Sequence, residues 1–336
     1  CRGGIFDRGM RSIGRSLLLT MMCGLWLAQA EAYETDQYTN RHVSVADSTA
    51  VLNARVNETL RAIVAEWDGD YDRMEFVDEF YRKLGGRHWV DRLERWAMQS
   101  PDVDKLEVGR YDSVFADQPF WATRVVKLFG TGKTIKVNDE LIGSDKIGHF
   151  ISQGRKYYRR YLRYESEERA AEQSAFTERA LFGSMTTGIY SNADVVANYE
   201  GHRFYRSLFE DGIIPGKPAI LRWENTGWIM QRDFDWADHV NAYWDEALNV
   251  NHYDALLYRH MHDTFVDLCP QYWQRPELYT VTDEEALRSK YAHLQLRDTS
   301  ELRLDSLCPV QAFLEGDTSK FVTPEGKSAP GVPASP

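Results

Sequence analysis

Two sets of polar residues at helical spacing constrain the fold of this 336-residue chain more than any other feature. Asp145 and His149 are four positions apart, so both project from one face of a helix. Asp194, Asn198 and His202 repeat this spacing and also share one helix face. Both sets lie in otherwise apolar segments, and charges buried in such segments need partners. The sequence therefore predicts that the helices carrying these sets pack together around a polar site.

Each of these residues also has a purely structural interpretation. Asp145 suits a helix N-terminus, and Asp194 lies in the first turn of its expected helix, where a carboxylate is favourable. His149 suits a core position with satisfied hydrogen bonds, and Asn198 and His202 suit hydrogen bonds to a neighbouring turn. For any one residue the structural interpretation is preferred, whereas the joint pattern favours a polar site.

The donor set of this site suits a divalent cation with nitrogen and oxygen ligands, and histidine favours zinc over magnesium. The candidate ligands are His149, Asp194 and His202. A cation-bound water would be the nucleophile of a hydrolase, with a spare carboxylate as its base. Asp145 and Glu178, the latter in the segment between the two sets, are candidate supporting catalytic residues.

Basic residues add further candidates beside this site. Lys146 would stabilise anionic charge during catalysis. Residues 153–164 interleave arginine and lysine with tyrosine, and Arg155 and Arg159 are candidate binding residues for a lipid headgroup or an anionic glycan. The preferred alternative is a solvated helix whose arginines pair with the glutamates of residues 165–172.

Two short motifs contain most of the candidate residues. The first reads Asp145-Lys146-x-x-His149-Phe150, and the second reads Ser191-x-x-Asp194-x-x-Ala197-Asn198-x-x-Gly201. This pair, which covers roughly sixty residues, resembles the paired motif of VanZ-like membrane proteins and of small YfiM-type envelope lipoproteins.

The resemblance implies an envelope protein with a polar site made by Asp145, Lys146, His149, Asp194 and Asn198. It also implies an acidic residue between the two motifs, for which Glu178 and Glu172 are both available. VanZ-like proteins carry these motifs on membrane helices, whereas this chain is expected to have a soluble body.

The N-terminus has the layout of a targeting segment. Arg8, Arg11 and Arg15 precede a short apolar run at residues 17–27, and small residues suited to cleavage follow. This order is typical of a signal peptide, and the apolar run is too short to span a bilayer. We therefore expect residues 1–32 to be removed on export, with an uncleaved anchor as the alternative. The mature chain is expected to contain no membrane span.

The net charge limits the class of expected partners, and the cysteine content predicts a disulfide. The formal net charge of −11 makes general nucleic-acid binding improbable, so an envelope lipid, glycan or protein is the expected partner. Cys269 and Cys308 are the cysteines that remain after export. An oxidising compartment favours a disulfide between them over two buried thiols.

The hydrophobic pattern predicts a mainly α-helical single domain over residues 33–315, with one or two small β-hairpins and the central motif at residues 144–212. Residues 316–336 are rich in Pro, Ser, Gly and Thr and are expected to be a disordered tail. Helices are predicted at residues 47–67, 72–84, 90–99, 145–164, 165–182, 192–209, 236–248, 252–269 and 283–294, and hairpins at 133–142 and 220–231.

These features together predict an exported periplasmic or envelope protein with a buried polar site. In the leading hypothesis the site binds a divalent cation such as zinc and hydrolyses an envelope component, for example a lipid or peptidoglycan. The alternative is a non-catalytic envelope binding or scaffolding protein, in which the same residues form a hydrogen-bonded network that fixes three helices.

Overall fold

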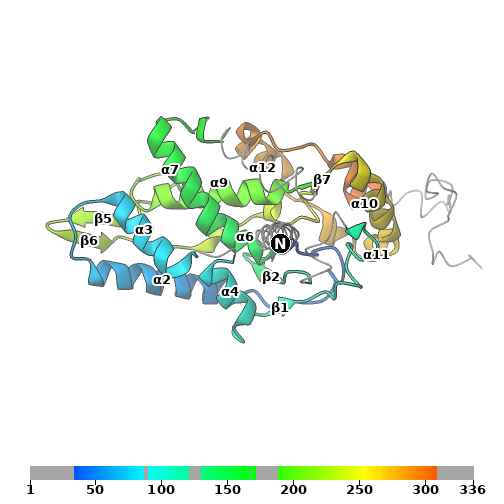
Figure 1. Cartoon of the computed structure of the whole chain (residues 1–336), viewed down its shortest axis with the longest axis horizontal. Helices are drawn as coiled ribbons and strands as arrows, with labels where there is room; N and C mark the ends of the chain where they lie inside the picture. The colour runs from blue at the N-terminus through cyan, green and yellow to red at the C-terminus, as the bar shows by residue number, and fades with distance from the viewer. Residues whose placement is uncertain (1–33, 87–89, 121–129, 168, 172–187, 309–336) are drawn as a thin grey trace, which may run out of the picture. The chain divides into compact units, whose positions relative to one another are not determined.

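The computed structural model describes residues 34–86, 90–120, 130–167, 169–171 and 188–308 (Figure 1). The predicted signal peptide, the predicted tail, Glu178 and most of the helix expected at residues 165–182 lie outside these ranges. The described fold is mainly α-helical with small antiparallel sheets, as the sequence predicts.

No helix within the described ranges has the length and apolar content needed to cross a membrane.

The N-terminal section is helical, as predicted. It contains α2 (Thr49–Glu66), α3 (Arg73–Leu84) and α4 (Arg92–Gln99), and α2 packs against α3. Helix α3 begins after Asp72, whose side chain accepts hydrogen bonds from two backbone N–H groups of the first turn. The apolar residues of α2 that recur at helical spacing are buried, including Leu52. Amphipathic spacing therefore explains this section, with a side-chain cap at α3.

Both predicted hairpins are present. The first turns at Asn138 and Asp139, whose φ angles of 52° and 63° are those of a type I′ turn. A third strand, β1, pairs with this hairpin, and β4 pairs with β7; the sequence predicts neither pairing. The strands are β1 (Lys105–Leu106), β2 (Thr134–Val137), β3 (Glu140–Gly143), β4 (Ile189–Tyr190), β5 (Leu221–Glu224), β6 (Gly227–Met230) and β7 (His252–Tyr253).

Helix α9 (Asn192–Ser207) is buried along most of its length and packs against the helical segment predicted at residues 145–164. That segment is continuous, but it contains three parts: α6 (Asp145–Gly148), a π-helical turn η1 (His149–Gln153) and α7 (Gly154–Tyr164). Single π-helical turns within α-helices are frequent at functional sites. Here the turn begins at His149, a candidate site residue.

Two glycines allow the backbones of this segment and α9 to touch. A Cβ atom on Gly201 would lie 2.0 Å from the carbonyl oxygen of Phe150, and a Cβ atom on Gly154 would lie 2.6 Å from the backbone of Gly201. No side chain fits at such distances. This close approach therefore fixes the π-helical turn, and with it His149, against α9.

The prediction of a helix at residues 236–248 is wrong. The segment forms two 3₁₀ turns, η3 (Trp236–Asp238) and η4 (Ala242–Trp244). Asp235, Asn241 and Asp245 each accept a hydrogen bond from the backbone N–H two residues further on. Such local side-chain bonds compete with helical hydrogen bonds and favour turns.

The helix predicted at residues 252–269 is shorter than expected. Its first two residues belong to β7, and α10 (Ala255–Asp267) begins after Asp254, which caps it. The remaining helices of the described C-terminal part are α11 (Cys269–Gln274), η5 (Pro276–Tyr279), α12 (Glu284–Lys290), η6 (Ala292–Leu294), η7 (Ser300–Leu302) and α13 (Leu304–Leu307).

The predicted disulfide between Cys269 and Cys308 is present, with Cα atoms 5.3 Å apart. It joins the start of α11 to the residue after α13, and α11 and α13 are in contact. The crosslink closes a loop of 39 residues, which reduces the conformational freedom of the unfolded chain.

Candidate functional site

The side chain of Lys146 lies at the centre of the site and is 1% exposed. Its Nζ atom is 2.6 Å from Asp145 Oδ2, 2.7 Å from Asp194 Oδ1 and 2.6 Å from Glu246 Oε1. Burial alone would lower the pKa of this amine, but the surrounding carboxylates outweigh burial and raise the pKa of Lys146 well above its ordinary value. Lys146 is therefore a buried ammonium group held by carboxylates.

Glu246 is a site residue that the sequence does not predict. It is 100 positions from Lys146, in the segment predicted wrongly as a helix. Its backbone N–H donates to the side chain of Gln37, and the hydroxyl of Ser191 donates to its Oε1 atom at 3.1 Å. Burial raises the pKa of Glu246, and Lys146 only partly offsets this effect. No regular spacing connects Glu246 to the other residues, so sequence patterns gave no signal for it.

His149 contacts both of the residues expected from α9. Its Nδ1 atom lies 3.0 Å from Asn198 Oδ1, and its Nε2 atom lies 3.3 Å from Asp194 Oδ2. With the amide oxygen of Asn198 assigned to this side, Nδ1 carries a proton and the neutral ring presents the Nε2 lone pair to Asp194. A lone pair and a carboxylate repel each other, so this geometry requires either a protonated imidazole or a cation between the two groups.

Asp194 is ionised in this setting. It lies in the first turn of α9, and its backbone N–H donates to the hydroxyl of Ser191, the N-cap of this helix, at 3.1 Å. Burial would raise the pKa of Asp194, but His149 and Lys146 together outweigh burial, so the pKa lies below its ordinary value. The carboxylate therefore stays available as an acceptor or ligand at neutral pH.

Asp145, His149 and Asp194 each offer one ligand atom, and these atoms all lie within 4.8 Å of one another. Asp145 is buried, and its Oδ1 atom makes no hydrogen bond within the described part of the chain. The side chains of His149 and Asp194 are 11% and 19% exposed, so one edge of the group reaches solvent. An imidazole with two carboxylates is a donor set that suits zinc.

The structure places His202 apart from this group. His202 follows Asp194 by eight residues on α9, about 12 Å along a helix axis. Its ring stacks on Tyr157 with ring centres 4.5 Å apart, and its Nε2 atom lies 3.6 Å from Glu167. The ligand set that the structure assembles is therefore Asp145, His149 and Asp194, in place of the predicted set that included His202.

The two candidate binding arginines lie on α7. Arg155 donates from Nε to Asp78 of α3 at 2.9 Å, and its guanidinium lies 4.6 Å from the ring centre of Tyr81. Arg159 is exposed to solvent. Arg155 therefore pairs with an acid of the N-terminal section, whereas the sequence favours pairing with acids of residues 165–172.

Further acids lie close to the site. Burial raises the pKa values of Glu34 and Glu94 well above their ordinary values, and site carboxylates raise them further. Burial also raises the pKa of Asp91 to about 6, although a hydrogen bond from Ser152 opposes this shift. Acidic groups therefore outnumber the basic groups of the site, and several are protonated more readily than free carboxylic acids.

We expect the titration of Asp91 to raise the free energy of unfolding on acidification from about pH 7 to about pH 5, whereas the buried His202 and His239, whose pKa values burial lowers, have the opposite effect. Asp91 takes up its proton near pH 6 in the folded chain, against an ordinary pKa of 3.8, so at this group the folded state binds more protons in this window. The full effect of this shift, about 3 kcal/mol, is reached only below the ordinary value of 3.8, and between about pH 7 and pH 5 Asp91 contributes roughly 1.3 kcal/mol. Asp91→Asn should stabilise the protein at neutral pH and flatten the pH dependence.

Urea unfolding across this range measures both effects, and Asp70→Asn, at an exposed position, is the control. A pH dependence equal in the wild type and Asp91→Asn would contradict the assignment.

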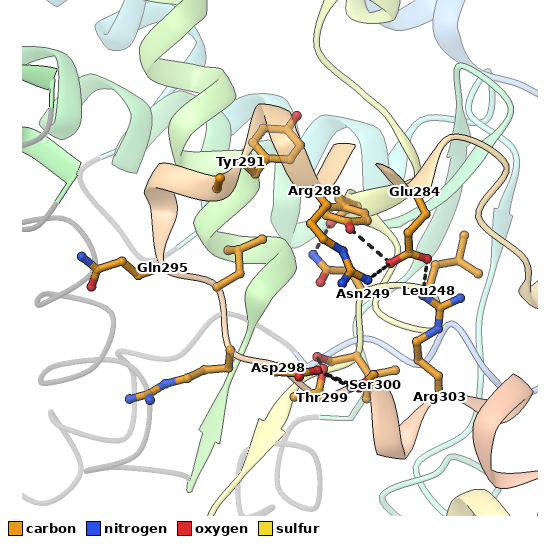
Figure 2. Close-up of a pocket in the computed structure, with 15 residues that line it drawn as sticks. Leu248, Asn249, Glu284, Arg288, Tyr291, Gln295, Asp298, Thr299, Ser300 and Arg303 are labelled. Atoms are coloured by element: carbon orange, nitrogen blue, oxygen red, sulfur yellow. Dashed lines mark hydrogen bonds and ion pairs between the residues drawn. The ribbon is translucent and has the colours of Figure 1, made fainter. Parts of the chain in front are cut away.

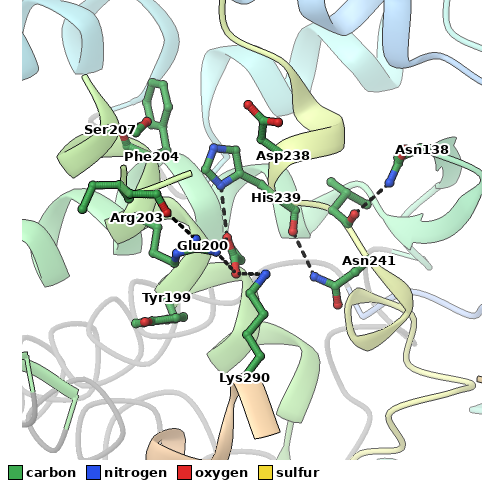
Figure 3. A network of polar contacts seen from close by, with 12 residues as sticks. Asn138, Tyr199, Glu200, Arg203, Phe204, Ser207, Asp238, His239, Asn241 and Lys290 are labelled. Carbon is green, nitrogen blue, oxygen red and sulfur yellow. Dashed lines mark hydrogen bonds and ion pairs between the residues drawn. The ribbon is translucent and has the colours of Figure 1, made fainter. Parts of the chain in front are cut away.

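A second buried network lies further along α9 (Figure 3). Glu200 is fully buried, and its Oε1 atom accepts hydrogen bonds from Arg203 at 3.0 Å and Tyr291 at 2.8 Å. Lys290 lies 2.8 Å from the same oxygen, and His239 lies 3.1 Å from Oε2. Burial would raise the pKa of Glu200, but these partners lower it below its ordinary value. Both carboxylate oxygens are satisfied, so this network ties α9 to α12 and to the segment after η3.

Comparison with known proteins gives no relative: no family model, curated protein or solved structure matches this chain. The resemblance to VanZ-like and YfiM-type proteins therefore stays a prediction from the motif pair. The structure brings together the residues that the resemblance implies as a polar site, which are Asp145, Lys146, His149, Asp194 and Asn198.

Proposed function

We propose that this chain is an exported envelope protein that binds a divalent cation such as zinc through Asp145, His149 and Asp194. The observation that carries the proposal is the convergence of three ligand atoms within 4.8 Å, beside a buried carboxylate oxygen that makes no hydrogen bond in the described ranges. The 3.3 Å approach of His149 Nε2 to Asp194 Oδ2 gives further support, because a cation would satisfy both a neutral imidazole and the carboxylate.

Export is supported by the disulfide between Cys269 and Cys308. Structural disulfides persist in oxidising compartments and are rare in the cytosol of most organisms. The layout of residues 1–32 as a signal peptide agrees with this location.

We further propose hydrolysis of an envelope component, such as a lipid or peptidoglycan, as the activity of this site. The chemistry that a bound cation supplies is activation of a water molecule. Asn198 fixes the imidazole of His149 through Nδ1, and Asp194 lies on the exposed edge, where a substrate has access. The ammonium of Lys146 faces inward, so its role is to hold the carboxylates in place.

Calorimetric titration of metal-stripped protein with zinc chloride tests the cation site. We expect one zinc ion per chain, with binding weakened about tenfold or more in His149→Ala and in Asp145→Asn. His252→Ala, which removes an exposed histidine from β7, should bind zinc as the wild type does. Absence of saturable binding to the wild type, or equal binding by all variants, would reject the proposed site.

A non-catalytic scaffolding function is the second candidate, and the contacts of Lys146 favour it. Its ammonium group touches Asp145, Asp194 and Glu246, so an internal cation already joins α6, α9 and the segment after η4. Treatment with a chelator separates the two functions. The cation site predicts a lower melting temperature after chelation, whereas a network closed by Lys146 alone predicts no change.

A further inference from the structure

A cavity of about 270 Å³ lies in the C-terminal part of the chain (Figure 2). Its walls come from residues 243–250, from α12 and from residues 295–303, and none of the ligands of the candidate cation site lines it. The lining combines charged, hydroxyl and amide groups with the apolar side chains of Leu248 and Leu296. Ligand sites combine apolar walls with a few polar groups that fix the orientation of the ligand, and this cavity has both.

Glu284 holds two arginines of this cavity in place. Arg288 donates from Nη2 to Glu284 Oε1 at 3.0 Å, and Arg303 donates from Nη1 to Glu284 Oε2. Figure 2 shows the carboxylate of Glu284 between the two guanidinium groups. Arg303 also pairs with Asp305 at 2.8 Å, so most of its donors are directed at acids. Arg288 pairs with Glu284, whereas Arg303 pairs with both Glu284 and Asp305. The side chain of Arg288 is 73% exposed.

The lining of the cavity is basic although the whole chain is acidic. Three arginines (Arg288, Arg297 and Arg303) stand against Glu284 and Asp298, a balance of +1, whereas the chain carries −11. The Oδ1 atom of Asp298 accepts hydrogen bonds from the backbone N–H and the hydroxyl of Ser300. These local partners partly satisfy the carboxylate of Asp298. Glu284 and Asp305 offset the charge of Arg303, so the positive charge that an anion would meet is that of Arg288, which pairs with Glu284 through Nη2 and is 73% exposed.

We propose that this cavity binds a small anionic molecule through Arg288, with a carboxylate or phosphate group on a hydroxylated body. A guanidinium group presents five N–H donors in a planar fork that matches either anion. Arg288, Asn249 and Thr299 all line the cavity (Figure 2), and the side chains of Asn249 and Thr299 donate to the backbone carbonyls of Tyr243 and Val250. The cavity is at the small end of ligand sites, which suits a body the size of one sugar ring. The proposal is independent of the candidate cation site.

Calorimetry with four probes tests this site: glucuronate, glucose 6-phosphate, inorganic phosphate and neutral glucose. We expect saturable binding of glucuronate or glucose 6-phosphate, weakened about tenfold or more by Arg288→Ala. Glucose should bind far more weakly, and the comparison of the two acidic sugars identifies the preferred anion. Inorganic phosphate shows whether the anion alone is sufficient.

The matched control is Arg61→Ala, which removes an exposed arginine that pairs with Asp233 outside the cavity. It should leave binding unchanged. The proposal is overturned if no anionic probe binds saturably, if glucose binds as tightly as the acidic sugars, or if the two arginine variants weaken binding equally.

Discussion

Lys146→Met is expected to lower the free energy of unfolding by about 3–5 kcal/mol at neutral pH. The substitution keeps most of the side-chain volume but removes the ammonium that contacts Asp145, Asp194 and Glu246. Those carboxylates would then face one another in a buried site without a compensating charge, which is costly in a medium of low polarity. Urea unfolding in the presence of a chelator measures the effect without a contribution from bound metal.

Two further variants separate this effect from general changes of charge. Lys83→Met removes a lysine whose partner Glu66 is 67% exposed, and it should cost less than about 1 kcal/mol. Lys146→Met combined with Glu246→Gln should recover part of the lost stability, because one of the repelling carboxylates is then neutral. A Lys146→Met variant as stable as Lys83→Met would show that the buried contacts contribute little.

Gly201→Ala is expected to destabilise the protein by about 3 kcal/mol or more, at the upper end of overpacking substitutions. The new methyl group would lie 2.0 Å from the carbonyl oxygen of Phe150 and 2.8 Å from its carbonyl carbon. These are backbone atoms, so no side-chain rotation relieves the clash. Helix α9 must move away from the π-helical turn, and His149 moves away from Asp194 and Asn198.

The control is Gly227→Ala at the start of β6, where an added methyl group meets no atom within 4 Å and the φ angle is ordinary. Thermal unfolding of both variants, followed by circular dichroism, measures the difference. We also expect Gly201→Ala, if it folds, to lose zinc binding while Gly227→Ala keeps it. Equal stability of the two variants would show that α9 and the π-helical turn are not held in contact at Gly201.

The predictions from sequence succeeded where short-range chemistry determines the structure. Helix α9 begins at the predicted residue 192 with Ser191 as its N-cap, and the hairpin predicted at residues 133–142 turns at Asn138 and Asp139. Asp145 and His149, four residues apart in sequence, both lie close to Asp194, as their shared helix face predicts. Capping, turn conformation and helical periodicity act over a few residues, so they can be recognised without the tertiary structure.

The remaining features depend on contacts between distant segments. Glu246 reaches Lys146 because side-chain hydrogen bonds of the preceding acidic and amide residues break the expected helix, and no periodicity records this. His202 shares a helix face with Asp194, but eight residues separate them by about 12 Å along the axis, so a common face is not a common site. The strands β4 and β7 contain two residues each, too few for an alternating pattern.

X-ray absorption spectroscopy of the zinc-loaded wild-type protein tests the central claim most directly, because it reports the ligands of the bound ion. The proposed site predicts a first shell with one imidazole nitrogen at about 2.0–2.1 Å and carboxylate oxygens at about 2.0–2.2 Å, and loss of the imidazole signal in His149→Ala. His252→Ala should keep the wild-type spectrum. A shell without imidazole, or one that His149→Ala leaves unchanged, would contradict a cation site at Asp145, His149 and Asp194.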